Sequence, residues 1–289
     1  MARRARAVGM SSLRRIWQSG ELPARLVTTA MLRAVLSPMI YAKYREGLPT
    51  RLTSATPTDE PRGACPGPDP DRILVIGGIS GAAVGVSSFR LGVACSSAEA
   101  LSRLSGRGAE WTSMAVPIVR SGMTTRYLTG LPDLHRFDAI VFFPGVSGAL
   151  SLTSPRRWSR DLERTVAQLV DRSASDATIL VADVPHVADR VQAPRFVRSV
   201  VRQHTTVLNA LTEQVVARSA RARMTYMPSI DRRMVVDGVF SYTRLYRIWG
   251  THVGQCIAAE RGYTTDDEDA GPAQVEPTRA DDGMTDRGD

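Results

Sequence analysis

The stretch from 71 to 86 constrains the fold of this chain more than any other. Its sequence is Asp-Arg-Ile-Leu-Val-Ile-Gly-Gly-Ile-Ser-Gly-Ala-Ala-Val-Gly-Val. The apolar run from Ile73 to Ile76 has no polar alternation, which is typical of a strand buried on both faces of a parallel sheet. The pattern predicts such a strand, then a tight turn and the start of a helix. Open α/β sheets place their sites at the carboxyl ends of strands like this one.

Similar apolar runs recur along the chain and alternate with segments of helical periodicity. Further strands are expected at 110–116, 137–144, 178–183 and 224–228, and helices at 89–104, 124–131, 154–172, 194–221 and 243–260. Ser154 and Pro155 suit the N-cap and first turn of the third helix. Five strands alternating with helices predict a three-layer α/β/α sandwich around a mainly parallel, five-stranded sheet.

The rest of the 289-residue chain divides by composition. Residues 1–46 form a basic arm with a helix, and residues 47–70 form a linker rich in proline. The predicted folded domain covers 71–262. The tail, 263–289, carries nine acidic residues against two arginines and lacks apolar periodicity, so we expect it to be disordered. The whole chain has a formal charge of +8.

The helix expected within the basic arm, at 26–42, is short and polar for a membrane span. It contains Arg33 and is interrupted by Pro38, whereas a span needs about 20 predominantly apolar residues. Three interpretations stay open: residues 1–45 lie on an anionic membrane surface, residues 26–42 span a membrane, or the helix packs on the folded domain. The segment lacks the clear cleavage site of a signal peptide, which leaves a cytoplasmic or a membrane-associated location open.

Composition and spacing argue against several other classes of function. Lys43 is the only lysine, and this arginine bias is typical of a GC-rich, actinobacterial-like genome. Aromatic residues do not interleave with the basic ones, so we expect no nucleic-acid partner. The three cysteines match no metal-site spacing, and the glycines after Ile76 lack the pattern of a phosphate-binding loop. We therefore expect neither a metal nor a cofactor.

The turns that follow the expected strands resemble those of the SGNH hydrolases, also called the GDSL lipase/esterase family. The motifs are Gly77 after the first strand, Ser-Gly-x-Thr at 121–124, Gly-Val-Ser-Gly at 145–148 and Asp-Gly at 237–238. The third motif, followed by Leu-Thr-Ser-Pro-Arg-Arg-Trp at 152–158, is most similar to the bacterial branch. The resemblance covers about 71–260. It implies a flavodoxin-like sandwich and a serine hydrolase acting on acyl esters.

The same resemblance implies that the hydrolytic residues have been replaced. The nucleophile position, two residues after Gly77, is Ile79, and the position of the base is Phe240. The oxyanion-binding Asn position is Ser147. The positions of the oxyanion glycine and the helping acid keep their residues, Gly122 and Asp237. Because Ile and Phe have no acid–base capacity, we expect a degenerate hydrolase that acts in binding or scaffolding, with an acyl or lipid ligand as one option.

An alternative prediction keeps the chain an active esterase or acyltransferase. Ser80, one residue after the nucleophile position, would serve as a displaced nucleophile, with His186 after the fourth strand as its base and Asp237 as the helping acid. The competing interpretations are that Ser80 caps the following helix and that His186 is a loop residue. These two functions make opposite predictions for labelling by an active-site probe.

Overall fold

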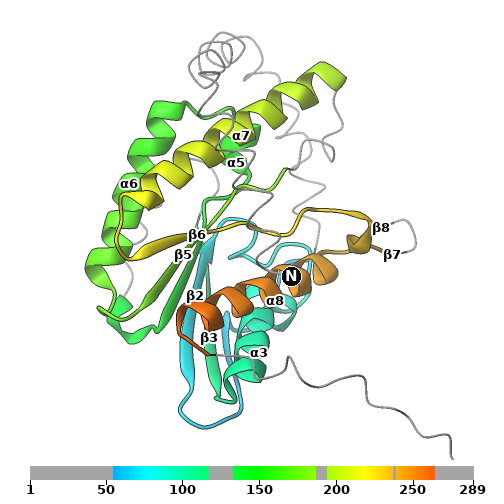
Figure 1. The fold of residues 1–289 in the computed structure, drawn as a ribbon. Coiled ribbons are helices and arrows are strands. Elements are labelled where there is room, and N and C mark those ends of the chain that lie inside the picture. The colour runs from blue at the N-terminus through cyan, green and yellow to red at the C-terminus, as the bar shows by residue number, and fades with distance from the viewer. Residues whose placement is uncertain (1–54, 117–132, 187–193, 237–238, 264–289) are drawn as a thin grey trace, which may run out of the picture.

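The computed structural model describes residues 55–116, 133–186, 194–236 and 239–263 (Figure 1). Several predicted features lie outside these residues: the basic arm, the helix at 124–131, Gly122, Asp237 and the tail beyond Tyr263. Within the described residues, no helix is both long enough and apolar enough to cross a membrane.

A six-stranded sheet forms the centre of the fold. Its spatial order is β1-β3-β2-β4-β5-β6. The strands are β1 (Arg62–Cys65), β2 (Asp71–Gly77), β3 (Ala109–Ala115), β4 (Ala139–Phe143), β5 (Thr178–Ala182) and β6 (Ala222–Thr225). Every pair among β2 to β6 is parallel, so the predicted mainly parallel sheet is confirmed.

The sheet has one strand more than the five predicted. β1 lies within the range predicted to be linker and pairs antiparallel with β3, Gly63 opposite Trp111. Its sequence, Arg-Gly-Ala-Cys, has no apolar alternation, and its residues remain half-buried or exposed. Such an edge strand is held by the main-chain ladder, which composition does not reveal.

Helices cover both faces of the sheet, as predicted. One face carries α3 (Val93–Ser105) and α8 (Tyr242–Glu260), and the other carries α6 (Pro155–Arg172) and α7 (Arg195–Ala217) (Figure 1). A short helix, α5 (Ser147–Leu150), follows β4. Strand residues alternate between the two layers: Ile73 and Val75 pack in the α3–α8 core, while Leu74 and Ile76 pack in the α6–α7 core. This alternation explains why β2 is apolar without interruption.

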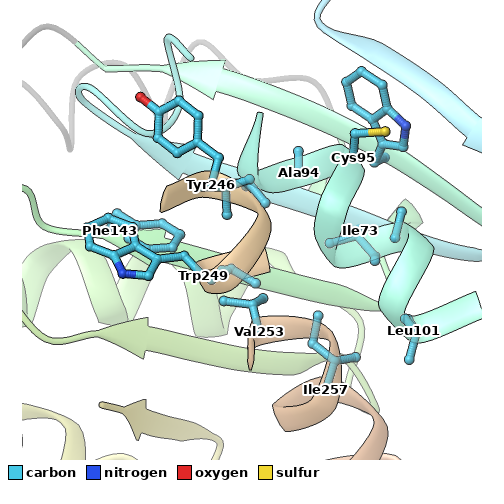
Figure 2. Close-up of a cluster of buried hydrophobic side chains, with 14 of the residues drawn as sticks. Ile73, Ala94, Cys95, Leu101, Phe143, Tyr246, Trp249, Val253 and Ile257 are labelled. Atoms are coloured by element: carbon cyan, nitrogen blue, oxygen red, sulfur yellow. The ribbon is translucent and has the colours of Figure 1, made fainter. Parts of the chain in front are cut away.

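Helices α3 and α8 pack against each other (Figure 2), and small residues lie where their backbones meet. A Cβ atom on Gly250 would lie 2.3 Å from the Cβ of Ser96, and one on Gly254 would lie 2.7 Å from the Cβ of Ala100. Because neither glycine has a side chain, the two helix backbones can approach closely. The aromatic side chains of α8 are thereby positioned against the sheet.

The local predictions around these elements have different outcomes. Ser154 and Pro155 do open α6, although the Ser154 side chain makes no capping hydrogen bond. The helix start expected after Gly77 is wrong, because residues 79–85 form successive turns instead. A short 3-10 helix, η1 (Phe89–Leu91), precedes α3. Ser80 therefore does not cap a helix.

At the amino edge of the sheet, Asp71 is buried within a group of polar side chains. Its carboxylate lies 3.4 Å from Nε of Arg107 and 3.4 Å from Nε of Arg261. The hydroxyl of Tyr263 donates to Asp71 Oδ1 at 3.0 Å. These contacts attach the carboxyl end of α8 to the start of β2.

Candidate functional site

A cavity of about 360 Å³ lies at the carboxyl edge of the sheet. Clefts that hold small organic ligands have volumes of about 300–1,000 Å³, so this one lies at the lower end of that range. Its wall is mostly apolar and aromatic. The described lining residues are Gly78, Ile79, Ser80, Phe143, Gly145, Val146, Leu150, Asp183, Pro185, Ile230, Phe240, Tyr242, Leu245, Tyr246 and Trp249.

The turn after β2 brings Ile79 and Ser80 into this wall. A Cβ atom on Gly81 would lie 2.1 Å from the carbonyl oxygen of Met114, so only glycine fits where the turn passes the end of β3. The hydroxyl of Ser113 also donates to the carbonyl of Gly81 at 2.9 Å. The tight turn is thus fixed from β3, and the residues before Gly81 are held at the sheet edge.

An aromatic wall comes from α8 and its neighbours. The ring of Trp249 stacks on that of Phe143 (Figure 2), and their centroids are 6.2 Å apart. The ring of Phe240 meets that of Tyr242 edge-on, with centroids 5.1 Å apart. The indole N–H of Trp249 donates to the carbonyl of Pro228 at 3.0 Å. Hydrogen bonding and ring contacts thus restrict these side chains, leaving a preformed apolar surface.

Tyr246 connects the aromatic wall to the β2 turn. Its hydroxyl donates to the carbonyl of Val84 at 2.7 Å and lies 3.3 Å from the carbonyl of Ile79. Burial raises the pKa of Tyr246, so the phenol stays neutral and acts as a donor. This residue holds the turn in place and is engaged with backbone, away from any reactive role.

Asp183, directly after β5, is the acid of the cavity wall. Its Oδ1 accepts a hydrogen bond from the backbone N–H of Met227 at 2.8 Å. Among the described residues, no cation forms an ion pair with it. Burial raises the pKa of Asp183 to about 7, although the hydrogen bond from Met227 opposes this shift. Near neutral pH the carboxyl group therefore exists in both protonation states.

The backbone beside Asp183 is held by a side chain of α7. The amide of Asn209 accepts from the N–H of Val184 at 2.8 Å and donates to its carbonyl at 2.9 Å. Both groups of Val184 are buried, so this pair of hydrogen bonds replaces the sheet ladder where β5 ends. Asn209 thereby positions Asp183 at the cavity.

Asp183 is not one of the site residues predicted from the sequence, although the sequence carries a signal for it. The acid directly follows the apolar run Thr178–Ala182, at the sheet edge where sites were expected. Only the packed structure shows that it lacks a nearby cation, because β6 and α8 supply its surroundings.

The structure gathers some of the predicted site residues and separates others. Ile79, Ser80 and Phe240 line the same cavity. Ser147 begins α5 and is not among the described lining residues. His186 is exposed, and no hydrogen bond joins it to Ser80.

Two further features limit the chemistry of the cavity. Its described lining residues include no histidine. His252 instead lies 3.3 Å from the hydroxyl of Thr225, outside the lining, and burial lowers its pKa. No group of three or more His, Cys, Asp or Glu side chains that could hold a metal ion occurs in the described ranges.

Comparison with known proteins identifies the architecture. At the level of sequence, the chain matches no protein-family model and no curated protein. It is similar in structure to a carbohydrate esterase family 2 enzyme with a carbohydrate-binding domain from Corynascus thermopiles (Myceliophthora fergusii). The two are 16% identical over 68% of each chain, with a TM-score of 0.50.

Two other similar structures come from bacteria. A carbohydrate acetylesterase from Sinorhizobium meliloti is 11% identical, with 65% of this chain and 99% of that chain covered and a TM-score of 0.49. A putative lipolytic protein of the G-D-S-L family from Desulfitobacterium hafniense is 9% identical, with 64% and 98% covered and a TM-score of 0.45.

The fold is that of the SGNH/GDSL-type hydrolases. This confirms the expected SGNH-like fold and the predicted α/β/α sandwich. At such low identity the likeness establishes the fold alone, and one fold hosts many functions. The chemistry of the SGNH-type domain has to be argued from its own cavity.

Proposed function

We propose that this SGNH-type domain has lost its serine-hydrolase machinery and binds an apolar, acyl or lipid-like ligand in the cavity at the carboxyl edge of the sheet. The observation that carries the proposal is the position of Ile79. It follows Gly77 and Gly78 at the end of β2, where the resemblance expects the nucleophile, and it lines the cavity.

The position expected for the catalytic base also carries a residue without acid–base capacity. Phe240 presents a ring to the cavity and packs edge-on against Tyr242. A hydrocarbon ring cannot accept the proton of a nucleophile. Loss of either the nucleophile or the base of a serine triad lowers the rate by about 10⁶-fold. Replacement of both favours binding over turnover.

The shape and polarity of the cavity favour an apolar ligand. Most of the described wall consists of aliphatic and aromatic side chains, and the Phe143 and Trp249 rings are stacked before any ligand arrives. Burial of apolar ligand surface contributes about 25 cal/mol per Å² before the losses of association are subtracted. A short acyl chain is therefore the simplest occupant.

The loss of hydrolysis can be tested with probes of activated serine. The purified protein should not be labelled by a fluorophosphonate and should not hydrolyse p-nitrophenyl acyl esters above the background rate. An active SGNH esterase treated in parallel is the positive control. Labelling or turnover that disappears in Ser80→Ala would contradict the proposal.

Binding can be tested by calorimetry with n-octanol, a neutral apolar ligand. We expect saturable binding to the wild type and loss of binding in Ile79→Trp, which places a larger ring in the cavity wall. Circular dichroism should show that the variant is folded. Equal binding by wild type and Ile79→Trp would place the ligand elsewhere and contradict the assignment of this cavity.

An active esterase is the second candidate function, and the placement of Ser80 favours it. Ser80 is buried and lines the same cavity as Ile79. In this proposal, Ser80 attacks the acyl carbonyl, with His186 as base. The Ser80→Ala comparison in the labelling experiment decides between the two functions.

A further inference from the structure

Asp183 is the one carboxyl group among the described residues of a cavity wall that is otherwise mostly apolar and aromatic. We infer that it selects ligands by the charge of their head group, so that the cavity binds amphiphiles with a protonated amine and excludes acyl chains that end in a free carboxylate. This inference rests on the proposed binding function and names the ligand class of the same cavity.

Asp183 is held in place by hydrogen bonds but is not neutralised by a described cation. The backbone N–H of Met227 occupies Oδ1, and Asn209 fixes the following residue, Val184. The structure gives no ion pair to Asp183 within the described chain, in contrast to the buried Asp71 at the other edge. Asp183 is half-buried, and carboxylates that are shielded from water are usually paired, so this one has capacity for a cationic partner.

The charge of the ligand's head group determines whether Asp183 attracts or repels it. An ammonium group beside Asp183 would form a charge-assisted hydrogen bond in a site of low dielectric constant, where such bonds are strong. A carboxylate in the same place would face like charge, with no described basic side chain in the lining to offset the repulsion. The head-group order should therefore be amine above alcohol above carboxylate.

The cavity wall also presents aromatic rings to a ligand that reaches Asp183. Trp249, Phe143, Tyr242 and Phe240 line the same cavity as Asp183. The faces of such rings attract cations, and their hydrocarbon surface accepts an alkyl chain. One small cavity thus offers complementary surfaces for both parts of an alkylammonium ion.

The test compares three ligands with one chain length and different head groups. n-Octylamine, n-octanol and n-octanoate are titrated into the full-length protein at pH 8 by isothermal calorimetry. A hydrogen bond to a charged group corresponds to roughly 10- to 100-fold in affinity, so octylamine should bind tighter than octanol by that factor. Octanoate should bind more weakly than octanol.

The variant Asp183→Asn keeps the shape of the side chain and removes its charge. We expect it to bind octylamine and octanol within about threefold of each other and to bind octanoate more tightly than the wild type does. Asp231→Asn is the matched control, because Asp231 is an acid next to the lining residue Ile230, lies outside the described lining and pairs with Arg233. That control should keep the wild-type order.

The outcomes separate this inference from the function on which it rests. If the wild type binds octanol or octanoate as tightly as octylamine, the inference about charge is overturned while the apolar binding function stands. If none of the three ligands binds, both are overturned. If Asp231→Asn changes the order as much as Asp183→Asn does, the selectivity comes from general surface charge and the role of Asp183 is refuted.

Discussion

At each edge of the central sheet an acid lies at the end of an apolar strand, and the two acids have opposite surroundings. At the amino edge, Asp71 is 1% exposed and lies beside Arg107, Arg261 and the hydroxyl of Tyr263. At the carboxyl edge, Asp183 has a backbone N–H and an apolar cavity around it. The first arrangement surrounds the acid with two arginines and a hydroxyl of the fold itself, whereas the second leaves it available to a ligand.

This difference separates a structural acid from a candidate functional one. Buried charges in folded proteins are paired, hydrogen-bonded or shifted in pKa, and a shifted group in a cleft is a functional candidate. Asp71 is the structural acid, because its contacts join the end of α8 to β2. Burial raises the pKa of Asp183 to about 7, and this shift makes Asp183 the candidate functional acid.

The largest effect is expected from Asp71→Ala. The substitution leaves Arg107 and Arg261 without their shared carboxylate and removes the acceptor of Tyr263. Breaking a buried ion pair from one side lowers the free energy of unfolding by about 3 kcal/mol. Urea denaturation followed by circular dichroism at pH 7 measures this change.

The exposed pair formed by Asp231 and Arg233 supplies the control for that experiment. Asp231→Asn should leave the free energy of unfolding unchanged, because exposed ion pairs contribute little. If Asp71→Ala were as harmless as the control, the amino-edge network would have no structural role and the contrast between the edges would be wrong.

A smaller effect is expected from Asn209→Ala, which tests how the carboxyl edge is held. Both hydrogen bonds to Val184 are lost, and its buried N–H and carbonyl are left unpaired. We expect the free energy of unfolding to fall by about 2 kcal/mol and the binding of n-octylamine to weaken as Asp183 loses its position.

Thr206→Ala is the matched control on the same helix, since Thr206 is only half-buried and its hydroxyl donates locally to the carbonyl of Arg202. Stability and octylamine affinity should both be close to those of the wild type. Normal octylamine binding by Asn209→Ala, alongside lowered stability, would show that Asn209 supports the fold without positioning the acid.

The smallest change in stability is expected from Asp183→Asn, and its sign is opposite to that of Asp71→Ala. The folded-state pKa of Asp183, about 7, lies above the ordinary value of 3.8, so the folded chain holds the proton more tightly than the unfolded chain. Between those values, rising pH therefore removes stability from the wild type through this group. The Asn side chain does not ionise and therefore does not lose stability as the pH rises. Its amide oxygen can still accept the hydrogen bond from the backbone N–H of Met227.

Urea denaturation at pH 4 and pH 8 measures this linkage. The variant and the wild type should be nearly equal in stability at pH 4, whereas at pH 8 the variant should be the more stable of the two. The same titration on Asp231→Asn should show no such divergence from the wild type. A difference that does not change with pH would mean that Asp183 does not titrate in this window.

Much of the architecture could be predicted from local sequence. The run Ile73–Ile76 specified a strand buried on both faces, and Ser154-Pro155 marked the start of α6. The turn motifs predicted the SGNH-type fold and brought attention to Ile79 and Phe240. These signals are local, because periodicity and turn chemistry act within a few residues.

Other features depended on contacts between distant parts of the chain. β1 is a strand because β3 offers a free edge to an otherwise featureless segment. The turns at 79–85 replace an expected helix where Tyr246, from α8, bonds to the carbonyl of Val84. Neither outcome can be derived from the local sequence, since the partner lies many residues away.

The sequence by itself predicted the layers and the alternation of five strands with helices, and it led to the proposal that Ile79 and Phe240 occupy hydrolytic positions. The tertiary structure alone decided that Asp71 and Asp183, two acids at the ends of apolar strands, have different surroundings. The physical reason is that the energy of a buried charge depends on which side chains surround it. Those side chains come from the residues that follow α3 and α8 for Asp71. For Asp183, the surrounding groups come from α8 and from the residues after β6.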